Sequence, residues 1–195
     1  MDYSIIMILS MLILSAFFSG MEIAYVSSNK VHIAIEKQQD GFLSKILQKI
    51  TKRPSKFITT MLIGNNIALV IYGFFMGDLL MGYIATYLTI EPNGFLALFI
   101  QTIISTVLIL LTAEFLPKVF FQIYANSFVK FFALPVYFFY ILFSIISEFV
   151  IWITDKILKL VFKTDGDEVQ LSFSKVELGN YISEQMETVK TEDEV

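Results

Sequence analysis

The chain has 195 residues, of which 56% are hydrophobic and only 16% are charged. Soluble domains are about 25% charged, so this composition, with a mean hydropathy of +0.70, indicates a membrane protein and excludes a soluble enzyme and a disordered segment. The sequence contains no cysteine and one histidine, which excludes disulfide-linked domains and the usual zinc ligand sets. The net charge of −4 carries less information than the position of each charge along the chain.

Residues 3–26 predict a first transmembrane helix. Their apolar run is interrupted once, by the sequence SGME at residues 19–22. A secretory signal peptide begins with basic residues and ends at a cleavage site of small residues, whereas the first charge here is that of Asp2. We therefore expect this helix to be retained.

Residues 27–56 carry seven basic side chains against two acidic ones. The positive-inside rule places such a loop in the cytoplasm. Its apolar residues recur partly at helical spacing, which predicts amphipathic helices on the inner membrane surface; a solvated linker is the alternative. The basic residues are Lys30, Lys37, Lys45, Lys49, Lys52, Arg53 and Lys56.

Residues 57–90 and 95–116 predict the second and third crossings, because about 20 apolar residues span a bilayer as a helix. The second crossing is interrupted by GNN at residues 64–66, and the third ends at Pro117-Lys118. The loop between the two crossings has no basic residue, which predicts that it lies on the outer side of the membrane, opposite the cytoplasm.

Residues 131–153 are also apolar, but basic residues flank this segment on both sides, so both of its ends are expected in the cytoplasm. Pro135 lies near its start, where it would break or kink a helix, and Glu148 interrupts its second half. We therefore expect a juxtamembrane or re-entrant element rather than a full span. Three crossings then place the N-terminus outside and the C-terminus in the cytoplasm.

The predicted fold is thus an all-α membrane protein, with three transmembrane helices that have broken, polar-lined segments, plus juxtamembrane helices. We expect a transmembrane domain with its juxtamembrane helices at residues 1–163, and an acidic cytoplasmic segment at 164–195 with a short helix at 174–186. The acidic segment has no apolar core of its own. We therefore expect it to lead into a soluble domain beyond residue 195.

Polar side chains in the three predicted crossings form the candidate site. In hydrocarbon a polar or ionisable side chain is costly unless it finds a partner, so it indicates function by default. Serine hydroxyls, asparagine carbonyls, a carboxylate and backbone carbonyls freed by proline are hard oxygen ligands, which suit Mg²⁺, Ca²⁺ or Na⁺. The clusters are Ser15, Ser19, Gly20 and Glu22 in the first crossing, Gly64, Asn65 and Asn66 in the second, and Thr112, Ala113 and Glu114, followed by Leu116, Pro117 and Lys118, in the third.

Each cluster also has a purely structural interpretation. Ser15 and Ser19 could serve only helix packing, and the asparagines could bond a neighbouring helix. Glu22 and Lys118 could be interfacial side chains that reach toward water or head groups. Glu114 could pair with Lys118 at i, i+4 as a structural bridge.

Three motifs at these clusters resemble a known family. They read SAFFSGMEIA at residues 15–24, LIGNN at 62–66 and AEFLPK at 113–118. Together they resemble the three signatures of the transmembrane domain of the CNNM/CorC magnesium transporter family, and the resemblance covers about residues 3–165. Met21 stands where the family usually has a small or hydroxyl residue, and Ala113 where it usually has glycine. A backbone carbonyl ligand at position 113 survives that change, whereas a side-chain ligand at position 21 does not.

The resemblance implies a homodimer in the bacterial inner membrane, with three membrane helices per subunit, a belt of juxtamembrane helices and an outward N-terminus. It also implies a dehydrated Mg²⁺ held between the helices, transport coupled to Na⁺, and cytoplasmic CBS domains that bind ATP and would follow residue 195. We expect the basic loops to contact anionic membrane lipid rather than nucleic acid.

Our leading hypothesis is a secondary transporter or exporter of divalent cations, chiefly Mg²⁺, in which discontinuous helices hold the ion near the membrane centre. The alternative is a membrane-embedded sensor or scaffold that binds a cation and signals to cytoplasmic domains without ion flux. We do not expect an enzyme, because the sequence has no nucleophile and base pair, phosphate-binding glycine loop or metal hydrolase motif. The expected metal ligands are the side chains of Ser15, Ser19, Asn66 and Glu114 and the carbonyls of Gly20 and Ala113, with Glu22, Asn65 and Lys118 as secondary candidates.

Overall fold

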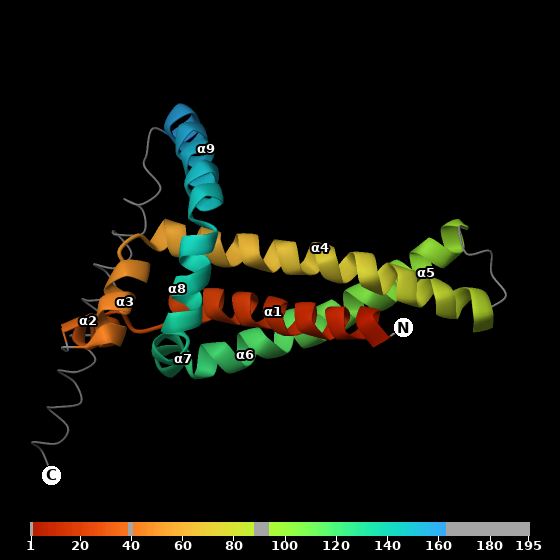
Figure 1. Cartoon of the computed structure of the whole chain (residues 1–195). Helices are drawn as coiled ribbons and strands as arrows, with labels where there is room; N and C mark the ends of the chain where they lie inside the picture. Colours follow the sequence, from red (N-terminus) through yellow and green to blue (C-terminus); the bar gives the residue numbers. More distant parts are fainter. Residues whose placement is uncertain (1, 39–40, 88–93, 163–195) are drawn as a thin grey trace, which may run out of the picture. The chain divides into compact units, whose positions relative to one another are not determined.

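The computed structural model of the chain describes residues 2–38, 41–87 and 94–162, and within these ranges it is helical and contains no strand. Figure 1 shows the helices coloured in chain order. They divide into two compact units: the first comprises Met1–Ser27 and Thr60–Val129, and the second comprises Ser28–Thr59 and Lys130–Val195. The predicted all-α fold is confirmed.

Three helical segments of the described chain are long and apolar enough to cross a membrane. Each contains an 18-residue stretch of high mean hydropathy, which is 2.2 within Tyr3–Ser27, 1.8 within Pro54–Tyr87 and 2.3 within Phe95–Ile123. The segments correspond to α1 (Asp2–Ser27), to α4 (Pro54–Tyr87), and to the succession of α5 (Phe95–Ile109), η1 (Leu110–Phe115) and α6 (Leu116–Ile123), in which η1 is π-helical. The prediction of three membrane helices is confirmed.

The first two crossings are continuous helices, so the breaks predicted at residues 19–22 and 64–66 are wrong. Glycine and asparagine each lower helix stability by about 1 kcal/mol or less, and the long apolar helices on either side outweigh that loss. The amide of Asn66 also finds a partner within the helix, since its Nδ2 donates to the backbone oxygen of Leu62 at 2.9 Å.

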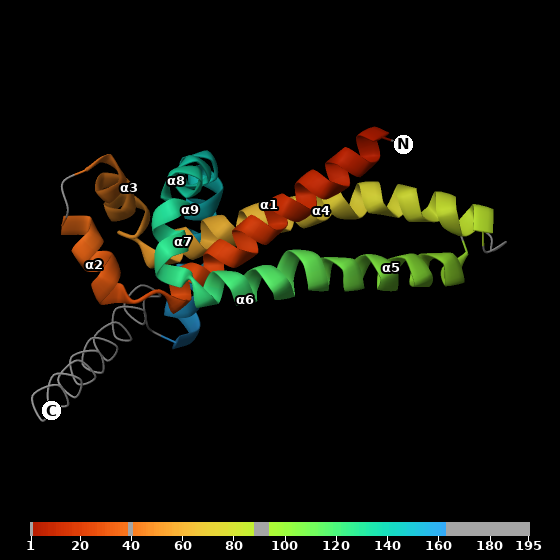
Figure 2. The same ribbon diagram turned by 90° about the horizontal axis from the view of Figure 1, so that it is seen from below.

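The third crossing does contain a change of helix type. Its α-helical winding gives way to the π-helical η1 at Leu110 and resumes in α6, which continues to Ile123 rather than ending at Leu116 as predicted. Pro117 is accommodated because it lies in the first turn of α6, next to a π-helical segment whose hydrogen-bond register already differs from that of an α-helix. Both η1 and α6 lie against α1 (Figure 2).

Apolar contacts between α1, α4 and α5 hold the first unit together. Ile8 of α1 packs with Tyr72 and Met76 of α4. The Tyr72 hydroxyl also donates to the backbone oxygen of Ser105 in α5 at 3.4 Å. Farther along α1, the ring of Phe18 is only 1% exposed, so the middle of α1 is enclosed by its neighbours.

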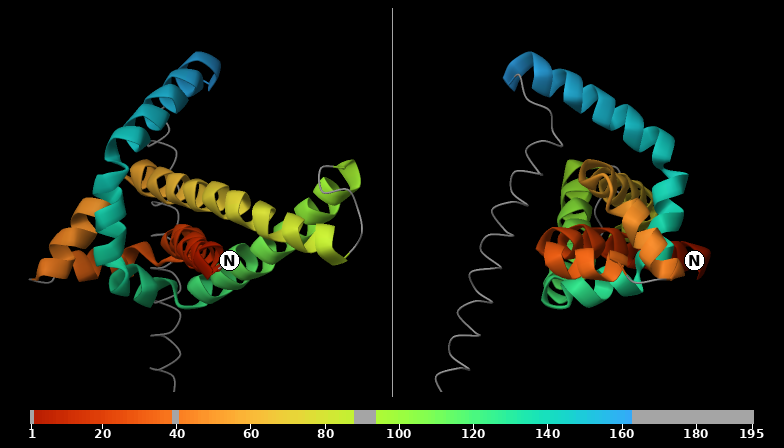
Figure 3. Two further views of the ribbon diagram at one scale, coloured as in Figure 1. Left: turned by 45° about the vertical axis from the view of Figure 1, so that its right-hand side comes forward. Right: turned by 90° about the vertical axis from the view of Figure 1, so that its left-hand side faces the viewer.

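The second unit contains short helices and the beginning of α4. The helices are α2 (Lys30–Gln38), α3 (Phe42–Ile50), α8 (Ala133–Leu142) and α9 (Ser144–Phe162). α3 contacts both α2 and α8, and α9 follows α8 (Figure 3). Because α3 buries Ile46, Leu47 and Ile50 and leaves Lys45 and Lys49 exposed, the amphipathic helices predicted in residues 27–56 are confirmed and the solvated linker is wrong.

Residues 131–153 do not form one straight helix. α7 (Ala125–Phe131) and α8 pass the length and hydropathy criteria for a span only as a pair bent by 64°. Pro135 lies in the first turn of α8, where a proline is tolerated because the first helical N–H groups have no partner within the helix. The geometry favours the predicted juxtamembrane or re-entrant element, and its side of the membrane stays a prediction.

Glu148, which interrupts the apolar pattern of this region, forms ion pairs with Arg53 and Lys56 near the start of α9. Its Oε1 accepts hydrogen bonds from Arg53 Nη1 at 2.7 Å and from Lys56 Nζ at 2.9 Å. These two donors hold the pKa of the Glu148 carboxyl below its usual value, the Lys56 hydrogen bond contributing most. The acidic segment at 164–195 and the helix expected at 174–186 lie outside the described residues.

Candidate functional site between the membrane helices

The candidate site begins with a hydrogen bond between α1 and α4. Ser15 is 0% exposed, and its Oγ donates to Oδ1 of Asn65 at 2.6 Å. The two residues are 50 positions apart in the sequence, so the bond joins the first two crossings at the middle of α1. The structure therefore brings a predicted ligand, Ser15, together with a secondary candidate, Asn65.

Ser19 lies one helical turn beyond Ser15 on the same face of α1. It is also 0% exposed, yet its Oγ has no hydrogen-bond partner among the residues that the structure describes. Most buried side-chain polar atoms form a hydrogen bond, so a buried atom without one indicates a partner that is not protein, such as a bound ion or water. The hydroxyl of Ser19 is thus available to a ligand that is not protein.

Two glycines allow aromatic rings to lie directly against the helix backbones around these serines. A Cβ added at Gly20 would lie 2.6 Å from the ring of Phe121 in α6, and a Cβ added at Gly64 would collide with the ring of Phe18. Any side chain at either position would force the ring away. Both glycines lie within the motifs singled out in the sequence, whereas no pattern in the sequence pointed to the two rings that cover them.

The π-helical segment provides backbone oxygen atoms opposite α1. The N–H of Leu116 donates to the oxygen of Leu111, five residues back, and Thr112 Oγ1 donates to the oxygen of Leu108 at 2.6 Å. Pro117 has no N–H, so one backbone carbonyl in the preceding turn receives no hydrogen bond from residue 117. In π register that carbonyl belongs to Thr112, and in α register it belongs to Ala113, which is 0% exposed.

Three charged side chains occur in the same helices. Glu114 in η1 and Glu22 in α1 are half-buried, and Lys118 in α6 is exposed. Glu22 interacts electrostatically with both Lys118 and Glu114, but none of the ion pairs found among the described residues joins any two of the three. The structural bridge from Glu114 to Lys118 is therefore not formed.

Asn66 is the predicted ligand that the structure does not bring to the serines. Its side chain is exposed and donates to the oxygen of Leu62 within α4, whereas the neighbouring Asn65 reaches Ser15. Successive helical residues differ by about 100° around the axis, so only one of the two asparagines can face α1. The role of Asn66 as a ligand stays a prediction.

No group of three or more histidine, aspartate or glutamate side chains that could hold a metal occurs among the described residues. The available ligands are instead hydroxyl, amide and backbone carbonyl oxygens, with Glu114 and Glu22 as the nearby carboxylates. Such a set is typical of a hard cation that is bound and released, rather than of a transition metal held tightly.

Comparison with known proteins agrees with this architecture. The family model described as the cyclin M transmembrane N-terminal domain, CNNM, matches residues 5–194. The chain belongs to the CNNM family. It is also similar to the UPF0053 inner membrane protein YfjD of Escherichia coli K12, with 25% identity over 175 residues. This match covers 88% of the chain but only 38% of the relative, so the chain spans less than half of the length of that protein.

Proposed function

We propose that this CNNM membrane domain transports divalent cations, chiefly Mg²⁺, by holding the dehydrated ion between α1, α4 and the η1 segment. The observation that carries the proposal is the hydroxyl of Ser19, which is fully buried and has no partner among the described residues. A buried polar group costs free energy unless it is satisfied. A cation in contact with Ser19 Oγ would satisfy it.

The remaining ligands follow from the same helices. The hydroxyl of Ser15 and the carbonyl of Asn65 already contact each other at 2.6 Å, and both oxygens could turn to a cation once it enters. The carbonyls of Gly20 and Ala113 and the carboxylate of Glu114 complete the proposed set. Mg²⁺ requires close, nearly octahedral oxygen coordination, so the Ser15–Asn65 bond must open when the ion binds.

A small polar cavity in the first unit lies at the C-terminal end of α1. It has a volume of about 250 Å³. Its lining residues are Ser27, Gln122, Ile123, Tyr124, Ala125, Asn126 and Ser127. Hydroxyl and amide groups can coordinate a partly hydrated cation, so we propose this cavity as the inner end of the ion pathway.

Several features of the proposal concern the whole protein. We propose a homodimer in the bacterial inner membrane, with the N-terminus outside and the C-terminus in the cytoplasm, in which Mg²⁺ movement is coupled to Na⁺. Cytoplasmic CBS domains that bind ATP would follow residue 195; the greater length of the similar inner membrane protein leaves room for such domains. Reporter fusions placed after Lys130 and after Lys163 should both report cytoplasm, and fusions on opposite sides would overturn this topology.

Flux in liposomes tests the proposal against the sensor or scaffold alternative. The chain is reconstituted in vesicles that contain a Mg²⁺-sensitive dye, and a Mg²⁺ gradient is imposed with and without a Na⁺ gradient. We expect flux in the wild type, loss of at least tenfold in Ser19→Ala, and no change in Ser10→Ala, which alters an exposed serine of the same helix. Binding of Mg²⁺ without flux would favour the sensor.

A further inference from the structure

A cavity of about 520 Å³ lies between α2 and α3 in the second unit. Its lining residues are Ala34, Lys37, Gln38, Gly41, Ser44, Lys45 and Gln48. They provide two ammonium groups, two amides and a hydroxyl, and the lining residues that the structure describes include no carboxylate. This composition is typical of a site for an anion.

Hydrogen bonds between the two helices fix the walls of the cavity. Ser44 Oγ donates to the backbone oxygen of Glu36, and Gln48 Nε2 donates to that of Lys37, each at 2.8 Å. At the start of α2, Asn29 Oδ1 accepts the N–H groups of Val31 and His32 at 2.8 and 3.1 Å, which caps the helix. The backbone that carries the cavity side chains is therefore held in place before a ligand binds.

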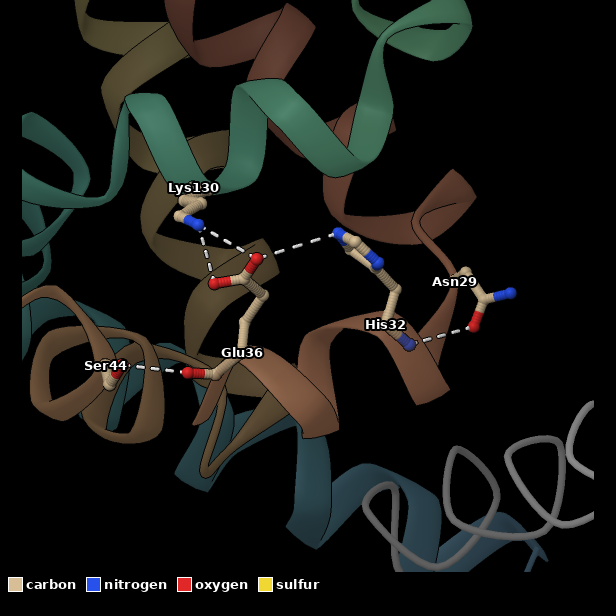
Figure 4. Close-up of polar contacts among 5 residues, drawn as sticks. All are labelled: Asn29, His32, Glu36, Ser44 and Lys130. Carbon is tan, nitrogen blue, oxygen red and sulfur yellow. Dashed lines mark hydrogen bonds and ion pairs between the residues drawn. The ribbon is translucent and has the colours of Figure 1, made fainter. Parts of the chain in front are cut away.

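Glu36 is the only acidic residue in the described parts of α2 and α3, and it does not neutralise the cavity lysines. Its carboxylate pairs with Lys130 Nζ at 2.7 Å and lies 4.0 Å from His32 Nε2. Figure 4 shows the Glu36 carboxylate directed toward these two side chains. The charge of Glu36 is thus already balanced by Lys130.

The ammonium groups of Lys37 and Lys45 have no hydrogen-bond or ion-pair partner among the described residues. Lys37 is half-buried, and its burial, followed by the nearby charge of Lys30, lowers its pKa below the usual value. Partial burial of an ammonium group without a counter-ion is unfavourable, so a bound anion would relieve that cost at Lys37, and the exposed Lys45 would add a second positive charge.

Three exposed apolar side chains of α2 and α3 are sequence neighbours of residues that line the cavity. Ile35 on α2 and Phe42 and Leu43 on α3 are 54%, 70% and 42% exposed, although large apolar side chains are costly in water. A cationic cavity beside exposed apolar residues is suited to a lipid, whose phosphate group is charged and whose acyl chains are apolar.

We propose that the α2–α3 cavity binds the phosphate group of an anionic phospholipid headgroup, through Lys37 and Lys45. The acyl chains would lie along Ile35, Phe42 and Leu43. The residues of this cavity belong to the second unit and those of the proposed ion site to the first, so the lipid proposal does not rest on the proposed Mg²⁺ transport.

Native mass spectrometry of the 195-residue chain in a neutral detergent tests this proposal. Dioctanoyl phosphatidylglycerol, dioctanoyl phosphatidylcholine, inorganic phosphate and ATP are each titrated against the wild type and three variants. Lys37→Gln/Lys45→Gln removes the two cavity charges, and Lys37→Arg/Lys45→Arg keeps them. Lys52→Gln/Lys156→Gln removes two charges from positions that do not line the cavity.

We expect one saturable phosphatidylglycerol per chain and much weaker binding of phosphatidylcholine. Each lysine near an anionic lipid surface contributes a factor of about five in affinity, so the double glutamine variant should bind about 25-fold more weakly. The arginine variant and the Lys52/Lys156 control should bind within about threefold of the wild type. Circular dichroism confirms that each variant is folded.

Two results would overturn the proposal. Equal losses in the cavity variant and in the control would mean that net charge, not the cavity, attracts the lipid. Binding of phosphate or ATP that depends on Lys37 and Lys45, without binding of phosphatidylglycerol, would overturn the assignment to lipid. It would mean that the cavity binds a soluble phosphate compound.

Discussion

Replacement of Ser19 by alanine should stabilise the ion-free protein, although it removes a residue of the proposed site. The Ser19 hydroxyl is 0% exposed and has no partner among the described residues, and an unsatisfied buried polar group costs about 1–3 kcal/mol. Alanine removes that group and has the higher helix propensity. We expect the free energy of unfolding to rise by about 1 kcal/mol.

Ser15→Ala, one turn away on the same helix, should have the opposite effect. Its Oγ donates to Asn65 at 2.6 Å, so alanine would leave the Asn65 carbonyl without its donor. Losing a buried hydrogen bond in this way destabilises by about 1–2 kcal/mol. The two substitutions are chemically identical and differ only in whether the hydroxyl is paired.

Magnesium should reverse the advantage of Ser19→Ala. A ligand that binds only the folded protein stabilises it by RT ln(1 + [L]/Kd), or about 2.7 kcal/mol at a hundredfold excess over Kd. The wild type should gain this stabilisation, and both serine variants should lose most of it. For a chain of this size 1 kcal/mol corresponds to about 2–4 °C in Tm, so each difference is measurable.

The assay is thermal unfolding in detergent, followed by far-ultraviolet circular dichroism, with and without Mg²⁺. Ser10→Ala is the control, since Ser10 lies on α1 but is exposed, and it should match the wild type in both conditions. If Ser19→Ala instead destabilises the ion-free protein and retains the full Mg²⁺ response, the hydroxyl of Ser19 is paired in solution and is not a ligand.

Three further predictions concern charge, pH and assembly. Glu114→Gln should lose most of the Mg²⁺ stabilisation, because it removes a full charge from the proposed ligands, while Glu148→Gln in the second unit should keep it; equal responses would remove Glu114 from the site. Since the pKa of the Glu148 carboxyl is lowered in the folded state, its ion pairs stabilise the fold above the ordinary carboxyl pKa and are lost as pH falls through the lowered value. The Tm of the wild type should therefore decrease on acidification more than that of Glu148→Gln, and identical pH profiles would refute this. A Cβ at Gly73 meets nothing within 4 Å, so Gly73→Leu should leave the subunit folded. If small residues let two subunits approach at Gly73, this variant should have a larger monomer fraction in size-exclusion chromatography with light scattering. The control Gly82→Leu, also at an open position, should remain dimeric, and a dimer in both variants would place the interface elsewhere.

The membrane architecture could be predicted because it depends on composition over long windows. Each crossing contains enough apolar residues to span a bilayer, and the basic residues of 27–56 separate the first crossing from the second. Local interruptions were predicted less well. Serine, glycine and asparagine at residues 19–22 and 64–66 reduce hydropathy without breaking α1 or α4, because the helix backbone depends on hydrogen bonds that hydropathy does not report.

The site could be predicted by residue type but not by orientation. Asn65 and Asn66 are identical side chains in adjacent positions, and the rotation of α4 relative to α1 decides which of them contacts Ser15. That rotation is fixed by packing, including the contact of Gly64 with the ring of Phe18. No property of the asparagines themselves distinguishes them, so the structure was required.

The same packing explains how an unpaired hydroxyl can persist inside the first unit. The ring of Phe121 covers the α1 backbone at Gly20, next to Ser19, and the ring of Phe18 covers the α4 backbone at Gly64; Ser19 itself is 0% exposed. An ion that reaches Ser19 must therefore leave most of its water behind, and Mg²⁺ gives up water reluctantly. Oxygen atoms must replace that water at once, and in the proposed site they would come from α1, α4 and η1, where glycines let the rings and backbones approach closely. The glycines are consequently part of the proposed ion chemistry, although neither of them supplies a side chain.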